Sequence, residues 1–170
     1  MYKRQALAAV EDTSRSALNE LRRLLGVLRQ DGDEADGLGP APGLGDLGRL
    51  AAQMGEAGLA VELEMRGTRP AVPPGVDLSA YRIVQESLTN VLKHAGPATA
   101  KVRVGYDEHE LRVEVTDDGR GAAAGETAGG HGIAGMRERA AVFGGELSAG
   151  PRQGGGFRVA ARLPLEGGRP

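Results

Sequence analysis

The feature that most constrains this chain is a glycine-rich stretch that runs directly into a predicted helix. Residues 129–136 read GGHGIAGM, in which Gly130, Gly132 and Gly135 have the spacing G-x-G-x-x-G. Glycines that open a helix let backbone N–H groups approach an anion closely, at the positive end of the helix dipole. An ordinary loop with a glycine hinge is the alternative, so further motifs have to distinguish the two.

The same spacing marks the dinucleotide-binding turn of a doubly wound fold, but its surroundings do not fit that fold. A strand would have to lead directly into the first glycine, and an acid would have to follow about 20 residues later. Here a glycine-rich loop precedes Gly130, and Gly150 stands where the acid is required. The phosphate-binding loop that ends in Gly-Lys-Ser/Thr is excluded too, because the chain has no Gly-Lys pair.

Length and composition favour a single ordinary domain with an appendage. The 170 residues carry 21 basic and 23 acidic side chains, so no overall field attracts nucleic acid or anionic lipid. Cys is absent, which fits a reducing compartment, and no apolar run is long enough to cross a bilayer. We therefore expect a soluble, cytoplasmic chain that does not bind nucleic acid directly.

The N-terminal part divides into a helix and a linker. Apolar residues repeat in threes and fours across residues 1–30, which is typical of a helix that pairs with other helices. Such a helix can fold back on its own domain or join an intermolecular bundle. Residues 31–43 contain acidic residues, Gly and Pro without a period, which indicates a linker. The main domain is predicted over residues 44–166.

The pattern of residues 44–166 predicts a sheet with helices on one face. Strands and helices mix there without regular β-α-β alternation, which favours a two-layer α/β arrangement. Two period-two segments separated by DEHE indicate a hairpin. The predicted helices cover residues 44–54, 77–94 and 133–143, and the predicted strands cover residues 59–65, 99–106, 111–117, 145–150 and 156–165.

The predicted helix over residues 77–94 has a polar side opposite its apolar side. At about 100° per residue, that side gathers Glu86, Asn90, Lys93 and His94. An amide oxygen such as that of Asn90 suits Mg²⁺, which takes few protein ligands beside substrate phosphates. Lys93 could neutralise phosphate charge, and Glu86 could orient or deprotonate a nucleophile. A solvated helix face is the alternative interpretation of such a set.

A second polar motif follows the predicted strand over residues 111–117. The chain reads VTDDGRG there, and Asp117 stands at the end of a strand predicted to be buried on one face. A carboxylate at this place can accept a hydrogen bond from an exocyclic amine, while Gly119 and Gly121 relieve crowding beside a flat base. Alone, Asp-Asp-Gly is simply a turn. The occurrence of all three motifs in this order is a more specific signal than any one of them alone.

The three motifs E-x-x-x-N-x-x-K-H, D-D-G-x-G and G-x-G-x-x-G-M resemble the N, G1 and G2 boxes of the GHKL ATPase superfamily. Within it, residues 81–95 and 129–147 look like the ATP-binding domain of bacterial two-component sensor histidine kinases, the class paired with helix-turn-helix response regulators. The resemblance extends from about Leu44 to Leu165. Residues 6–29 look like the second helix of that class's dimerisation and phosphotransfer hairpin, so residues 1–30 are assigned to it.

The resemblance implies a Bergerat-type two-layer α/β sandwich, a mixed sheet with helices on one face, preceded by a long N-terminal helix. It implies Mg-ATP as the ligand, with Asp117 at adenine, Asn90 at Mg²⁺, and Lys93 with His94 near phosphate and ribose. Gly119 and Gly121 would edge the base, while Gly130, Gly132 and Gly135 would hold phosphates beneath a lid from about Ala122 to His131. The remaining nucleotide contacts that it implies are His131, Ile133 and Met136.

The implied activity is that of a histidine kinase, which passes the γ-phosphoryl group of ATP to a histidine in two-component signalling. The implied partners are the phosphoacceptor hairpin of a homodimeric parent kinase and a response regulator with helix-turn-helix output. The parent would place this part in the cytoplasm, with or without a membrane anchor. A regulatory module such as an anti-sigma factor serine kinase, and a nucleotide-binding dimerisation module without kinase activity, are the alternatives.

The acceptor histidine belongs on the first helix of the hairpin, and we expect this chain to begin after it. His94, His109 and His131 do not replace it, so the chain alone is expected not to phosphorylate itself. Glu86 is the candidate catalytic residue, although an acid beside the missing acceptor can serve as the base, which favours Glu86 as an organiser of water or metal. Phe157 stands where some relatives place a Thr, so no hydroxyl contact to phosphate is expected there.

Overall fold

The computed structural model describes residues 41–120 and 131–165 of the 170-residue chain. The chain divides after Pro40 into two units, and the described residues all belong to the second of them. Within these residues, no helix combines the length and the apolar character that crossing a bilayer requires.

Several predictions fall on residues outside this description. They are the N-terminal helix over residues 1–30, the linker over 31–43 apart from its last three residues, and the lid over 122–131 apart from His131, which begins a helix. The expected nucleotide contacts at Gly121 and Gly130 lie outside it as well.

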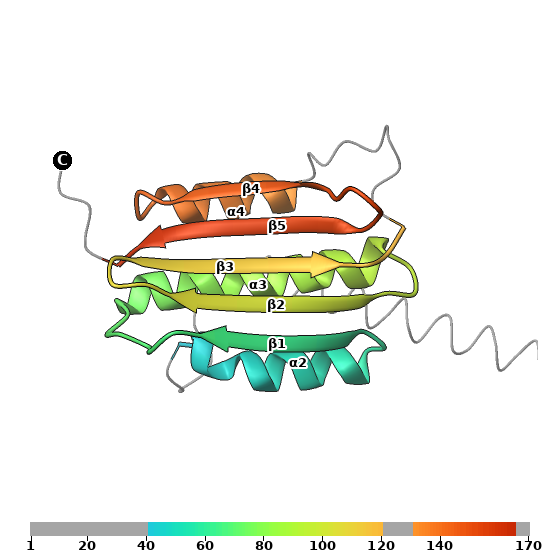
Figure 1. Ribbon diagram of the computed structural model, residues 1–170, viewed down its shortest axis with the longest axis horizontal. Coiled ribbons are helices and arrows are strands. Elements are labelled where there is room, and N and C mark those ends of the chain that lie inside the picture. The colour runs from blue at the N-terminus through green and yellow to red at the C-terminus, as the bar shows by residue number, and fades with distance from the viewer. Residues whose placement is uncertain (1–40, 121–130, 166–170) are drawn as a thin grey trace, which may run out of the picture. The chain divides into compact units, whose positions relative to one another are not determined.

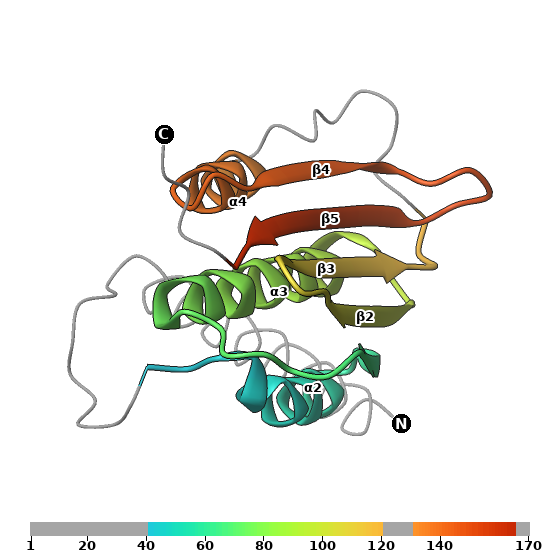
Figure 2. The ribbon, with the colours of Figure 1, turned by 60° about the vertical axis from the view of Figure 1, so that its left-hand side comes forward.

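The elements of the described residues, in chain order, are η1 (Leu44–Asp46), α2 (Leu47–Glu56), β1 (Ala60–Arg66), α3 (Pro74–His94), β2 (Thr99–Tyr106), β3 (Glu110–Asp117), α4 (His131–Ala141), β4 (Glu146–Pro151) and β5 (Phe157–Pro164). The strands form one sheet in the order β1-β2-β3-β5-β4. β1 and β2 run parallel, and the other neighbouring strands run antiparallel. In both ribbon views α2, α3 and α4 lie on the same side of the sheet (Figure 1, Figure 2). The predicted mixed sheet with helices on one face is therefore confirmed.

The hydrophobic core lies between the sheet and the helices because apolar residues alternate along the strands. Val102 and Val104 of β2 and Val113 and Val115 of β3 are all buried, and the residues between them face away from the helices. Burying a Val side chain contributes ~1.5–3 kcal/mol relative to leaving it exposed. The apolar side of α3, with Leu88 at 1% exposure, covers the same face.

The long helix α3 begins earlier than the sequence pattern indicated, at Pro74 instead of Asp77. A proline fits the first helical position because the N–H that it lacks would have no partner within the helix there. Asp77 accepts hydrogen bonds from the N–H of Leu44 at 3.3 Å and from Arg69 Nη2 at 3.2 Å. These bonds join the first turn of α3 to η1 and to the loop before the helix.

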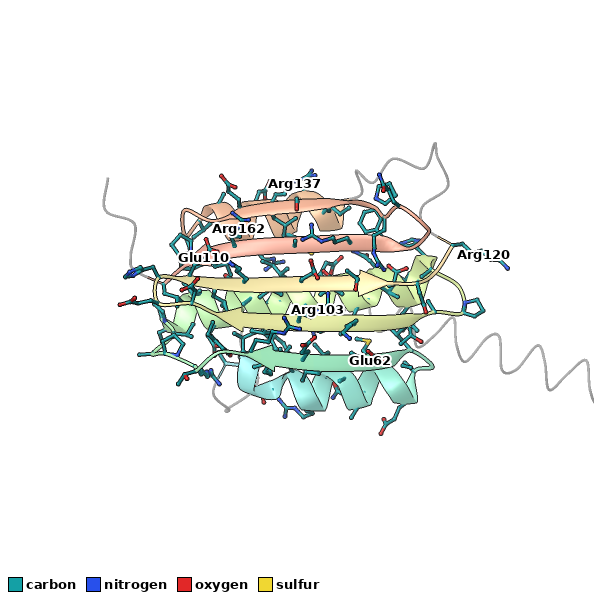
Figure 3. The ribbon with its side chains drawn as sticks, viewed as in Figure 1. Glu62, Arg103, Glu110, Arg120, Arg137 and Arg162 are labelled. Carbon is teal, nitrogen blue, oxygen red and sulfur yellow. The ribbon has the colours of Figure 1, made fainter. Side chains whose placement is uncertain are left out.

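The other face of the sheet carries a row of charged side chains across its strands (Figure 3). Arg103 donates to Glu64 at 3.1 Å and to Glu114 at 2.9 Å, and Arg158 donates to Glu114 at 2.7 Å. Burial acts to raise the pKa of Glu114, but the hydrogen bonds from Arg158 and Arg103 outweigh it and hold that pKa below its ordinary value. The row therefore links β1, β2, β3 and β5 by electrostatics as well as by backbone bonds.

The substitution Glu114→Gln is expected to lower the free energy of unfolding at pH 7 by roughly 0.5–1 kcal/mol, because partly exposed ion pairs are screened by water. The folded-state pKa of Glu114 is depressed. Its stabilisation is therefore present above the unfolded-state pKa and is lost as the pH falls through the folded-state pKa. Urea unfolding of both proteins should show a difference near neutrality that shrinks in acid.

The matched control is Glu56→Gln at the end of α2, where the structure shows no ion pair among the described residues. This variant should follow the wild-type pH profile closely. A Glu114→Gln profile that stays parallel to wild type from neutral pH into acid would contradict the assignment of the ion pairs.

Candidate nucleotide-binding site

Asp117, the last residue of β3, is buried with 4% of its surface exposed. Its Oδ1 accepts a hydrogen bond from the N–H of Gly119 at 2.9 Å, and its Oδ2 accepts one from the N–H of Phe157 at 3.2 Å. It is the only carboxylate that is buried in the part of the chain the structure describes. Each oxygen keeps acceptor capacity beyond these bonds, so the group can still receive a donor from a ligand.

The turn after Asp117 is held against the end of α3 by a close backbone approach. A Cβ atom at position 119 would lie 2.5 Å from the Cβ of Ala95 and 2.6 Å from its carbonyl oxygen. The N–H of Arg120 donates to the same carbonyl at 3.2 Å. Gly119 is therefore needed for packing between β3 and α3, a role separate from the expected contact with a base.

Glu86 and Asn90 of α3 face the first turn of α4. A Cβ atom at position 132 would lie 2.5 Å from Glu86 Oε1 and 3.5 Å from Asn90 Nδ2. Gly132 is the second residue of α4, so its neighbours lie where a helix presents free N–H groups and a partial positive charge. The structure thus brings together three of the residues that the sequence singled out, from two separate motifs.

The packing of α4 on α3 fixes this arrangement. Ser87 Oγ donates to the carbonyl of Ile83 at 2.7 Å and contacts Met136 Sδ at 3.5 Å. The side chains of Ile133 and Met136, expected at the nucleotide, are 8% and 1% exposed and belong to the hydrophobic core. These side chains secure the helix that carries Gly132.

Two of the other predicted residues lie at the surface. Lys93 and His94 occupy the last turn of α3 and are exposed. His131 is the first residue of α4, and a Cβ atom at Gly135 would meet nothing within 4 Å among the described residues. In Figure 1 the ends of β3 and α3 and the start of α4 lie toward the same side of the domain.

One contributor to this site was missed by the sequence analysis. The turn between β4 and β5 reaches Asp117 through the side chain of Arg152, whose Nη1 donates to the Asp117 carbonyl at 3.0 Å, and the first residue of β5 reaches it through the backbone N–H of Phe157. The signal that could have found it is the triple glycine Gly154–Gly156, because consecutive glycines allow a turn to approach another backbone closely.

Comparison with known proteins identifies the family. Residues 75–167 match the family model described as histidine kinase-, DNA gyrase B-, and HSP90-like ATPase. The match covers more than half of the chain, and the chain belongs to this family. The resemblance on which the sequence analysis relied is therefore confirmed.

The similar proteins are sensor histidine kinases. The sensor histidine kinase YxjM of Bacillus subtilis is 38% identical over 72% of this chain, which corresponds to 30% of the relative. LiaS of the same organism is 32% identical over 92% of this chain and 42% of the relative. The chain thus spans less than half the length of these curated relatives.

A solved structure agrees with this assignment. The histidine kinase domain of the Erythrobacter litoralis EL346 blue-light activated histidine kinase superposes with a TM-score of 0.60 at 28% identity. The alignment covers 80% of this chain and 67% of that chain. The described domain is accordingly of the ATP-binding catalytic type found in sensor histidine kinases of two-component signalling.

The substitution Gly119→Ala is expected to lower the free energy of unfolding by about 1–3 kcal/mol, because the added methyl group overpacks the contact with Ala95. Urea unfolding of the full chain measures it. Gly48→Ala in α2 is the matched control, since a Cβ there meets nothing within 4 Å among the described residues. An equal response of the two variants would contradict the close approach.

Proposed function

We propose that this chain binds Mg-ATP where α3 meets the end of β3 and the start of α4, and that it provides the γ-phosphoryl group for a histidine in two-component signal transduction. The proposal depends on one observation: α3, which carries the first motif, is contacted by residues of the other two motifs. Gly132 lies against Glu86 and Asn90, and Gly119 lies against Ala95 little more than one turn further along α3.

The proposed role of Asp117 is to recognise the adenine base. Its carboxylate is anchored by two backbone N–H groups and keeps free acceptor positions, which suits the exocyclic amine of adenine. Gly119 and Gly121 would leave room at the edge of the base. Because the acid is buried, an approaching base would exchange little water for this bond.

The residues at the other end of the site suit a triphosphate. The N–H groups at the start of α4 and the exposed Lys93 offer positive charge, and His94 lies beside Lys93 at the end of α3. We assign Gly130, Gly132 and Gly135 to the phosphates, and His131 to the end of the lid over them. Positioning and charge neutralisation by such groups are the main requirements of phosphoryl transfer.

The donor atoms near Gly132 fit a magnesium ion held mainly by the nucleotide. Asn90 has an amide oxygen and Glu86 a carboxylate, which are ligand types that Mg²⁺ prefers. Among the described residues no cluster of three or more His, Cys, Asp or Glu could hold a metal by itself. Asn90 would therefore bind the ion together with ATP phosphates, Glu86 would organise water or metal, and the ion would neutralise phosphate charge.

The acceptor of the phosphoryl group would be a histidine on the phosphoacceptor hairpin of a homodimeric parent kinase, which would place this part in the cytoplasm and have a helix-turn-helix response regulator downstream. The histidines of this chain have other positions. His94 and His131 belong to the proposed nucleotide site, and the exposed His109 lies between β2 and β3. We therefore infer that this chain does not phosphorylate itself.

The substitution Asp117→Asn is expected to weaken ATP binding by about tenfold or more, because an amide replaces an acceptor that faces the exocyclic amine. Titration of the full chain with a fluorescent ATP analogue measures the affinity. Asp118→Asn is the matched control, since this neighbouring acid is exposed and accepts the N–H of Thr99 at 2.6 Å. The same affinity for Asp117→Asn as for the wild type would contradict the proposal.

The substitution Asn90→Ala is expected to remove most of the benefit of Mg²⁺ for ATP binding while leaving affinity in EDTA nearly unchanged. The reason is that the lost amide would contact the ion and not the base. Calorimetric titration with and without Mg²⁺ separates the contribution of the ion to ATP affinity from that of the nucleotide alone. Thr89→Ala, whose hydroxyl donates to the Gln85 carbonyl at 2.8 Å, is the control on the adjacent helix position. Equal Mg²⁺ dependence in Asn90→Ala and wild type would exclude Asn90 as the ligand.

A further inference from the structure

The turn between β4 and β5 and the first residue of β5 together approach Asp117 at three points. Arg152 Nη1 donates to its backbone carbonyl at 3.0 Å, and the N–H of Phe157 donates to its Oδ2 at 3.2 Å. A Cβ atom at position 156 would lie 1.9 Å from the same carbonyl oxygen. One short segment thus approaches both the backbone carbonyl and the carboxylate of a single buried acid.

The shape of this turn depends on its glycines. Gly154, Gly155 and Gly156 have φ angles of +90°, +107° and +81°. A side chain at such angles costs about 1–3 kcal/mol, so three in succession strongly favour glycine. The N–H of Arg152 donates to the Gly156 carbonyl at 3.0 Å, and the N–H of Gly155 donates to the Arg152 carbonyl at 3.2 Å. These bonds close the turn with Arg152 at its base.

The contacts with Asp117 begin where the sheet ladder stops. The paired residues of β3 and β5 run from Glu110 with Pro164 to Thr116 with Arg158, and they end one residue before Asp117. The Phe157 N–H consequently bonds the carboxylate of Asp117 and not its backbone. A buried carbonyl needs a hydrogen-bond partner, and the Arg152 guanidinium provides one for the carbonyl of Asp117.

Arg152 has no competing role among the described residues. The structure shows no ion pair between Arg152 and any acid there, although many other arginines of the sheet have one. Its side chain comes from an exposed position and turns to the end of β3. A surface arginine whose guanidinium donates to a backbone carbonyl next to the proposed base-binding acid is suited to fixing that acid.

From these contacts we infer that Arg152 is a positioning residue for base recognition, which holds the Asp117 backbone so that the carboxylate faces the exocyclic amine of adenine. The inference rests on the function proposed for Asp117. Without the guanidinium, the hydrogen bond that links the glycine turn to the Asp117 carbonyl would be lost. The contacts between Gly132, Glu86 and Asn90 would remain, because none of them involves this turn.

The test compares two nucleotides that differ at the atom Asp117 would read. Inosine triphosphate has a carbonyl oxygen in place of the exocyclic amine of adenine, and the phosphates are identical. Affinities of the full chain for Mg-ATP and Mg-inosine triphosphate are measured by calorimetry. The proteins are the wild type, Arg152→Ala, Arg152→Lys and the control Arg162→Ala, which removes an exposed arginine of β5 on the open face of the sheet (Figure 3).

Arg152→Ala should weaken Mg-ATP binding by about fivefold, because part of the free energy of one hydrogen bond with a charged donor is lost. Binding of Mg-inosine triphosphate should change by less than about twofold, so the preference for adenine falls. Arg152→Lys should restore most of the preference for adenine, because an ammonium group can also donate to the carbonyl. Arg162→Ala should match the wild type. Urea unfolding without nucleotide verifies that each variant is folded.

An unchanged adenine preference in Arg152→Ala would overturn the inference, and so would an equal loss for both nucleotides, since a general structural effect weakens both. Failure of the proposed function has a different signature. In that case the wild type itself binds no ATP, or Asp117→Asn keeps the wild-type preference for adenine. A preference lost in Asp117→Asn but retained in Arg152→Ala would overturn only the role of Arg152.

Discussion

The arrangement of this domain depends on one buried carboxylate at the end of a central strand. Burying a carboxyl group away from water costs free energy unless hydrogen bonds replace the lost hydration. For Asp117 these bonds come from the backbone of Gly119 on one side and of Phe157 on the other. The carboxylate receives both bonds because the turn after β3 and the start of β5 meet at this place. The two hydrogen bonds therefore join the middle of the sheet to the C-terminal hairpin.

Helix α3 connects this acid to the second half of the site. Its apolar side packs on the sheet, its end receives the turn after Asp117, and Glu86 with Asn90 faces the start of α4. The rigidity of a packed helix fixes the separation between the two halves, which a ligand with a base at one end and phosphates at the other requires. Residues buried between the two helices, such as Ser87 and Met136, contribute by keeping α4 in place.

The sequence predicted which helix or strand carries the candidate residues of each motif, and it missed the contacts that depend on register. Period-two strands and the order of the three motifs were sufficient to place Asp117 at a strand end and Asn90 on a helix. The contact of Arg152 could not be predicted, because it depends on where the pairing of β3 and β5 stops. Likewise, the contact of Gly132 with Glu86 could not be predicted from periodicity, because it depends on how α4 packs against α3.

The most direct test follows backbone amide signals of the isotopically labelled full chain during titration with Mg-ATP by nuclear magnetic resonance. If one nucleotide occupies both halves of the site, the signals of Asn90 and Gly132 and those of Asp117 and Gly119 shift together and saturate at the same ATP concentration. Adenine protons should then show through-space contacts to Gly119. Shifts confined to one half, or gathered on the open face of the sheet around Arg103, would contradict a single ATP site on α3.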